Sequence, residues 1–148
     1  MKKPFALFIA LLISLLINSQ QYKIELTEGC VIMKDPIAGG IYDIFDWKKS
    51  NATLQYDVYN NLIEITEDGK VVIKFYITET LKKLTNDNEI NYSFNCLQTS
   101  SFDNFKASSK GQVKLNLLKE EKNKRSVLIF ESDLTILIYR GRNALTKP

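Results

Sequence analysis

Apolar and polar residues alternate one by one along several separate stretches of this chain. In one of them, Leu54, Tyr56 and Val58 are separated by Gln55 and Asp57. Because successive side chains of a strand point to opposite faces of a sheet, this period of two predicts a strand with one buried and one solvated face. The stretches with this period are residues 22–26, 52–59, 71–78, 90–97 and 113–118, and two further runs, 127–130 and 134–139, are apolar at consecutive positions, as in central strands.

Turn-forming residues stand between these stretches. Asn60-Asn61 and Asp68-Gly69 tolerate the positive φ angles of two-residue hairpin turns, and they separate residues 52–58, 62–66 and 71–78. These three strands are therefore expected to form an antiparallel meander. Ser132-Asp133 is expected to turn the last hairpin, and Lys110-Gly111 to start a strand over residues 112–118.

The number of strands and the short turns predict an all-β fold. We expect an antiparallel up-and-down meander of about 8–9 strands that closes into a small barrel or a sandwich. At most one or two short helical turns are expected. Residues 79–88 are interpreted as such a turn, whereas residues 41–47 fit either a strand or a helical turn, and residues 98–109 fit either a long loop or a short helix.

The first nineteen residues have the pattern of a cleaved secretory leader. Lys2 and Lys3 precede an apolar run over residues 5–17, and Ile17 and Ser19 suit the positions before a cut after Ser19. A retained anchor is the alternative, but the run is shorter than the roughly 20 residues that a spanning helix needs. The sequence thus predicts a signal peptide at 1–19 and one exported β domain at 20–148, and in a bacterium the destination would be the periplasm, the cell surface or the medium.

Removal of this leader also changes the charge balance. The full chain has a formal charge of +3, and without Lys2 and Lys3 it keeps 18 basic against 17 acidic residues. A charge of +1 gives no argument for nucleic acid as a partner, and no segment after the leader is long enough to cross a bilayer.

Cys30 and Cys96 are the two cysteines of the chain. Cys96 shares the apolar face of its stretch with Tyr92 and Phe94, so it is expected to point inward. In an exported chain such a pair favours a disulfide, and the alternative is two buried free thiols.

The chain contains no histidine. This excludes nucleophile–histidine pairs and histidine-ligated metals, so acid–base catalysis would need carboxylates or a perturbed lysine. Asp43 and Asp46, beside Phe45 and Trp47, are the candidate pair for a hydrolase, and the wet face of a strand is the simpler interpretation. Residues 86–89 lack the glycine and the spacing of a calcium loop, and no cofactor or metal is predicted.

Four aromatic residues fall on or near polar strand faces. They are Tyr42, Trp47, Tyr59 and Tyr76, and Tyr59 and Tyr76 are expected to be neighbours across the meander. An exposed aromatic patch can bind a protein or a carbohydrate, while cross-strand aromatic pairs also stabilise sheets.

In size, leader and up-and-down pattern the chain is similar to small ligand-carrying barrels such as the lipocalins. No Gly-x-Trp opens its first strand, because the sole tryptophan, Trp47, follows Phe45-Asp46. The first functional hypothesis is therefore a non-enzymatic binding or accessory module. The resemblance implies a carrier of a small apolar ligand as the alternative, and a carboxylate-dependent hydrolase of an envelope polymer is the third.

Overall fold

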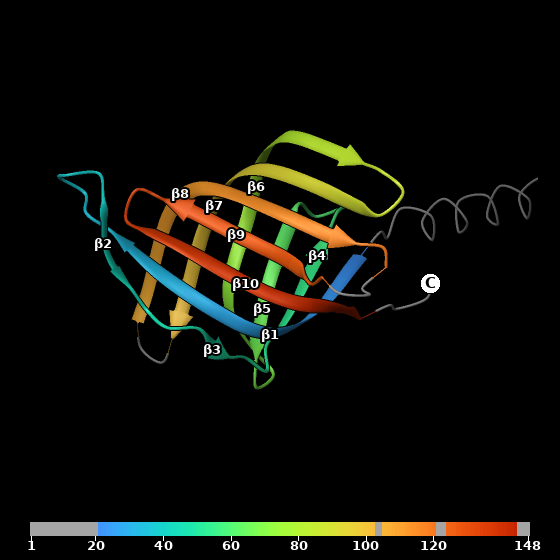
Figure 1. Ribbon diagram of the computed structural model, residues 1–148, viewed down its shortest axis with the longest axis horizontal. Helices are drawn as coiled ribbons and strands as arrows, with labels where there is room; N and C mark the ends of the chain where they lie inside the picture. The colour runs from blue at the N-terminus through green and yellow to red at the C-terminus, as the bar shows by residue number, and fades with distance from the viewer. Residues whose placement is uncertain (1–20, 103–104, 121–123, 145–148) are drawn as a thin grey trace, which may run out of the picture.

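The computed structural model describes residues 21–102, 105–120 and 124–144, and within these residues the chain forms strands and no helix. Figure 1 shows the strands tilted around a common axis. The elements are β1 (Gln21–Lys34), β2 (Ile41–Ile44), β3 (Lys48–Lys49), β4 (Thr53–Asp57), β5 (Leu62–Glu67), β6 (Lys70–Thr85), β7 (Glu89–Phe102), β8 (Phe105–Leu118), β9 (Ser126–Ser132) and β10 (Thr135–Ala144).

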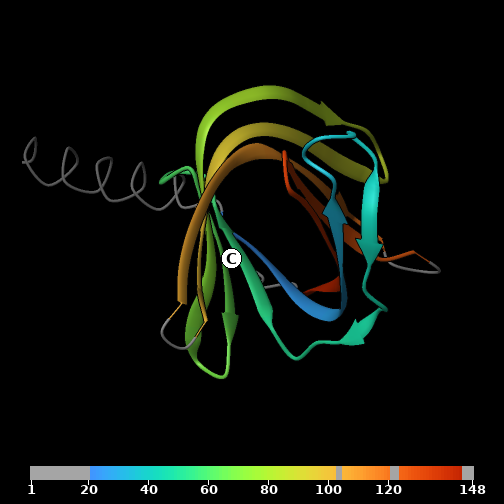
Figure 2. The same ribbon diagram turned by 90° about the vertical axis from the view of Figure 1, so that its left-hand side faces the viewer.

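Eight of these strands close into an antiparallel barrel. The strands β4 to β10 pair in sequence order, β4 also pairs with β1, and the pairing of β1 with β10 completes the ring (Figure 2). The expected all-β, up-and-down fold is confirmed, and the structure selects the barrel over the sandwich. Closure removes the two long edges that an open sheet of this size would expose.

The long strand β1 makes this closure possible. One of its edges pairs with β10 along most of its length, from Lys23 to Met33. The other edge pairs in turn with β4, β3 and β2, which follow one another like pieces of one interrupted strand. The segment at 41–47 that fitted strand or helix thus contains the strand β2.

The strands are strongly staggered. A path around the barrel that follows paired residues from strand to strand starts at Gln21, the first residue of β1, and comes back to Lys34, its last residue. The path closes where the backbone N–H of Lys34 donates a hydrogen bond of 2.8 Å to the carbonyl of Leu134, in the β9–β10 turn. A stagger of this size requires strands that are steeply tilted to the barrel axis. The path runs through Gln21, Asp57, Leu62, Tyr76, Leu97 and Lys110.

The meander β4–β5–β6 is present as expected, and its turns differ in length. Asp68 and Gly69 have φ angles of 49° and 76°, as a two-residue hairpin turn requires. The other turn spans residues 58–61, so it is longer than predicted. The carboxylate of Asp57 accepts hydrogen bonds from the backbone and side-chain nitrogens of Asn60, and Asn61 takes the positive φ of 51°.

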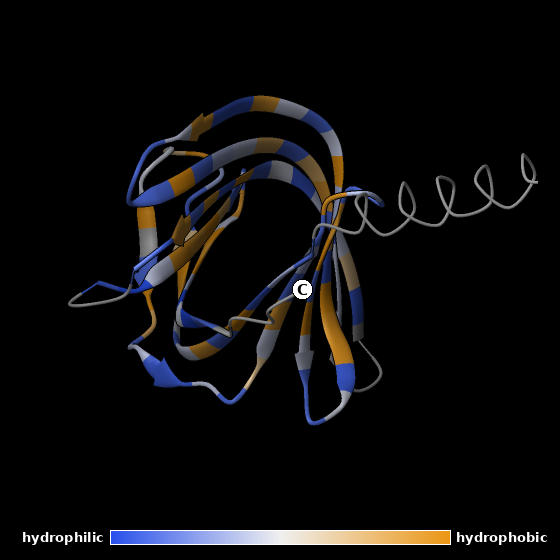
Figure 3. Ribbon diagram, turned by 90° about the vertical axis from the view of Figure 1, so that its right-hand side faces the viewer, coloured by the Kyte–Doolittle hydropathy of each residue, from blue (hydrophilic) through white to orange (hydrophobic). Residues whose placement is uncertain are grey.

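The barrel interior is filled by the apolar face of the strands. Phe75, Phe94 and Phe130 are fully buried at its centre, and Figure 3 shows the alternation of hydrophobic and hydrophilic residues along the long strands. Gly111 was expected at the start of a strand, yet it lies inside β8. A Cβ at this position would come within 2.3 Å of the backbone oxygen of Glu131, on β9. Glycine therefore lets β9 approach β8.

The second half of β6 departs from the expected helical turn at 79–88. It continues as a strand to Thr85, with register shifts after Ile77 and after Thr80. We call residues 78–85 the overhang, because β5 ends its pairing at Tyr76 and the overhang pairs only with β7. All of its residues are exposed. Two bulges bend the strand over the end of the barrel, where a helix would have lost this pairing.

The two cysteines do not form the expected disulfide. Both thiols are free and buried, and they lie on opposite faces of the barrel wall. Cys96 belongs to the interior core, whereas Cys30 is paired with Ile138 on the outer face and its thiol donates to the backbone oxygen of Phe45 at 3.0 Å. The cause is a bulge between Leu26 and Glu28, since one extra residue turns every later side chain of β1 to the other face.

The remaining expectations concern the signal peptide and membrane-spanning segments. The predicted signal peptide at 1–19 lies outside the described residues. Within the described ranges, no helix is long and apolar enough to cross a bilayer.

Candidate binding surfaces

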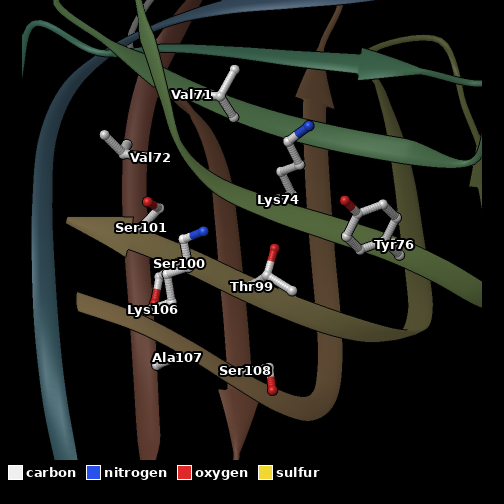
Figure 4. A pocket seen from close by; sticks show the side chains of 10 residues that line it. All are labelled: Val71, Val72, Lys74, Tyr76, Thr99, Ser100, Ser101, Lys106, Ala107 and Ser108. Atoms are coloured by element: carbon white, nitrogen blue, oxygen red, sulfur yellow. The ribbon is translucent and has the colours of Figure 1, made fainter. Parts of the chain in front are cut away.

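A groove of about 420 Å³ crosses the outer surface of β6, β7 and β8. Figure 4 shows its side chains, which are mostly hydroxyl, amine and small apolar groups. We call this feature the outer groove. Its lining residues are Val71, Val72, Lys74, Tyr76, Thr99, Ser100, Ser101, Lys106, Ala107 and Ser108.

Strand register explains why these side chains gather. Lys74 is paired with Thr99, and Thr99 is paired with Ser108, so these three side chains form one row across three strands. They lie on the outer face because the alternate residues, among them Phe75, enter the core. Tyr76 stands next to this row, with 43% of its surface exposed. The polar face of the alternating pattern thus becomes one continuous hydrogen-bonding surface.

Two lysines line the groove. Lys74 Nζ lies 3.0 Å from the Glu64 carboxylate, and this hydrogen bond raises the pKa of Lys74. Lys106, on β8, adds a second amine to the lining. The described lining contains no carboxylate. The groove therefore offers hydrogen-bond donors, hydroxyls and one aromatic ring.

Of the four predicted aromatic residues, Tyr76 is the one that lines the outer groove. Tyr59 lies in the 58–61 turn with 73% of its surface exposed, while Leu62 is the residue paired with Tyr76. Among the described side chains, no ring contact joins Tyr59 to Tyr76. The side chain of Tyr42, on β2, lies outside the described residues.

Trp47 lies on the other side of the barrel, between β2 and β3. The guanidinium of Arg140 covers its ring at 4.0 Å from the centroid, and Arg140 also lies 3.5 Å from Glu28. This cation–π contact ties the β2–β3 segment to β10. Beside it, Phe45 and Asp46 border a pocket of about 290 Å³. The Trp47 ring therefore already has a partner within the chain.

The candidate carboxylates of a hydrolase lie on this same segment. Asp43 accepts a 2.8 Å hydrogen bond from the backbone of Ile44, and Asp46 lines the pocket together with Lys48. Both aspartates are exposed. Asp43 thus stabilises its own backbone locally, and Asp46 has a lysine, rather than a second carboxylate, among the residues of the pocket.

Sequence reasoning missed a group of tyrosines inside the barrel, which we call the tyrosine cluster: Tyr22, Tyr56 and Tyr92. The rings of Tyr22 and Tyr56 stack at 5.9 Å, and Tyr56 meets Tyr92 edge to face at 5.4 Å. Burial raises the pKa of Tyr22 and of Tyr56 to about 12. A signal was present, because all three occupy apolar-face positions of alternating stretches, where a phenol hydroxyl needs a partner.

Within the described ranges, no group of three or more cysteine or acidic residues could hold a metal ion. The fold and these surfaces define the class of an eight-stranded antiparallel barrel with a packed core. No protein-family model, curated protein or solved structure matches the chain. One barrel architecture hosts many functions, so the fold alone assigns none of them to this chain.

Proposed function

We propose that this chain is an exported, non-enzymatic binding module whose outer groove binds a glycan that carries acidic groups. The observation that carries the proposal is the composition of the groove, which combines one exposed phenol ring, hydroxyls from two strands and two lysines. Export rests on the leader pattern of residues 1–19.

The chemistry of the groove suits a polyhydroxylated ligand. The ring of Tyr76 offers a flat apolar face, and the hydroxyls of Thr99, Ser101 and Ser108 both donate and accept hydrogen bonds. The side chains stand on paired strands, so a ligand would order their rotamers without having to order the backbone. Lys74 and Lys106 add donors that favour carboxylate or phosphate substituents.

Binding without catalysis follows from the same lining. Glycoside hydrolysis commonly uses two carboxyl groups about 5–10 Å apart on either side of the bond. Glu64, which pairs with Lys74, is on β5 and is not among the lining residues. The groove therefore supports recognition rather than bond cleavage.

The test is isothermal titration of the purified protein with a uronic-acid oligosaccharide and with a neutral glucan oligosaccharide. We expect the acidic ligand to bind, and Tyr76→Ala to weaken binding about tenfold, which corresponds to about 1.4 kcal/mol. Tyr59→Ala is the matched control, because Tyr59 is also an exposed tyrosine but stands outside the groove.

Equal loss in both tyrosine variants would contradict the proposal, as would binding of neither oligosaccharide. Turnover of either ligand that Asp43→Asn or Asp46→Asn abolishes would replace the binding module with the hydrolase.

A further inference from the structure

We propose that two copies of this chain associate by pairing their overhangs edge to edge, in antiparallel orientation about a two-fold axis. In this pairing, Glu79 of each copy lies opposite Lys82 of the other copy. The overhang is separate from the outer groove, so this interaction surface goes beyond the function proposed for that groove.

The free backbone edge of the overhang is the first observation. On the β5 side of β6, the last backbone hydrogen bond in the described ranges is donated by Ile77 to Asn61 at 2.9 Å. Beyond it, residues 78–85 pair with β7 alone. Figures 1 and 2 show this part of β6 as the outermost strand at its end of the barrel. Such an edge presents unpaired N–H and C=O groups that can pair with a strand of another chain.

Two opposite charges on the same face of the overhang are the second observation. Glu79 is paired with Asn95, whose side-chain amide donates a 2.8 Å hydrogen bond to the Glu79 carboxylate. Lys82 is paired with Ser93. Ser93 and Asn95 point outward, because Phe94 between them is fully buried in the core. Residues three positions apart in a regular strand lie on opposite faces, so the bulge between Glu79 and Lys82 brings them to one face.

This arrangement is complementary to itself. When two overhangs run antiparallel about an axis midway between Thr80 and Leu81, Glu79 falls opposite Lys82 of the other copy. The same two residues separate the charges on both strands, so the bulges also match. Opposite charges that face each other across two strands stabilise the pair, and two-fold symmetry makes this contact twice in each dimer.

The same features disfavour other strands as partners. Lysines and bulges on an edge strand commonly protect it against pairing with unrelated chains. Lys82 needs a carboxylate opposite it, and a regular strand does not follow the bulge. A second copy of the overhang carries both the carboxylate and the bulge at the required positions. The charge that opposes most strands therefore favours this one.

Exposed leucines add apolar area to the contact. Leu81 is 46% exposed and Leu84 is 53% exposed, and pairing with a second strand covers part of their surface. An interface limited to one strand edge is small, so we expect a weak dimer whose population depends on protein concentration.

The test is sedimentation velocity of the purified protein from about 1 µM to about 1 mM, where a weak dimer dissociates. Glu79→Lys should raise the dimer dissociation constant about tenfold, because two attractive contacts in each dimer become repulsive. Lys82→Glu should have the same effect, and the double variant Glu79→Lys/Lys82→Glu should restore the affinity of the unaltered protein. Glu67→Lys, on β5, is the matched control, because it changes the charge equally outside the overhang.

A protein that stays monomeric at the highest concentration would overturn the proposal, as would a dimer that Glu79→Lys leaves unchanged. A double variant that associates as weakly as the single variants would also overturn it.

Hydrogen–deuterium exchange locates the contact. Backbone amides of residues 78–85 should exchange more slowly at high protein concentration than at low concentration, and protection confined to other strands would contradict edge pairing. Tyr76→Ala should weaken glycan binding and keep the dimer, whereas Glu79→Lys should weaken the dimer and keep glycan binding. Each of the two proposals can therefore fail without the other.

Discussion

The two halves of β6 make an instructive comparison. In the first half, Ile73 and Phe75 are fully buried and the strand has a paired neighbour on each side. In the overhang, no residue is buried and one edge is unpaired. The first half of β6 thus contributes side chains to the core, and the second half is an exposed extension that is paired on one edge. The buried side chains of β6 are confined to its first half, while the second half is exposed along its whole length.

The largest expected effect comes from truncating a core residue in the first half of β6, compared with an exposed residue of the overhang. Phe75→Ala should lower the free energy of unfolding by about 3–5 kcal/mol, because it removes a fully buried ring from the barrel centre. Leu84→Ala, on the overhang, should change it by less than about 0.5 kcal/mol, since Leu84 is 53% exposed. Urea denaturation measures both. Similar losses in the two variants would show that the overhang is part of the cooperative core.

Two glycine substitutions compare a closely packed position of the barrel with an open one. Gly111→Ala should destabilise the protein by about 1–3 kcal/mol, because the new Cβ would lie 2.6 Å from the Phe130 ring and closer still to the Glu131 backbone. Gly40→Ala is the control, since no atom lies within 4 Å of its added Cβ. Thermal unfolding should separate the two variants, and an equally stable Gly111→Ala protein would mean that β8 and β9 can move apart.

The smallest expected effect is a pH dependence of stability that arises in the tyrosine cluster, on β1 and β4. Burial raises the pKa of Tyr22 and Tyr56 to about 12 from an ordinary value near 10, so the unfolded chain releases these protons first. Their contribution to stability is complete below about pH 10 and is lost as the pH rises towards 12. After allowance for solvent screening the loss is roughly 1 kcal/mol per phenol.

Unfolding by urea at a series of alkaline pH values measures this loss. Tyr56→Phe should show a shallower decline than the unaltered protein, whereas Tyr59→Phe, at an exposed turn position, should not. The same decline in both variants would mean that other groups cause the alkaline destabilisation.

Much of the fold could be predicted from the sequence. The alternation over residues 52–58, 62–66 and 71–78, with its turn residues, correctly predicted the meander β4–β5–β6. Such local patterns suffice because each hairpin joins strands that are adjacent in sequence. The expected helical turn at 79–88 was wrong, because Leu81 and Leu84 suit a helical face, yet pairing with β7 and two bulges hold the segment extended.

The candidate sites were less accessible to sequence reasoning. Tyr76 was found, because an aromatic residue on the polar face of a strand is visible in the alternation. Its partners Thr99 and Ser108 were not, because the pairing register that places them beside Lys74 is a tertiary property. The interior cluster was missed for the same reason, since Tyr22 and Tyr92 are far apart in the chain.

The sequence by itself determined the strand class, the meander and the absence of histidine chemistry, because these depend on residue types and on neighbours along the chain. Only the tertiary structure decided that the sheet closes, that Cys30 and Cys96 face opposite ways, and that residues 78–85 continue β6 as a strand. These features depend on stagger and on single-residue bulges in β1 and β6. A bulge inserts one extra residue and so turns all later side chains of the strand to the other face. The alternation of residue types does not by itself show where a bulge occurs.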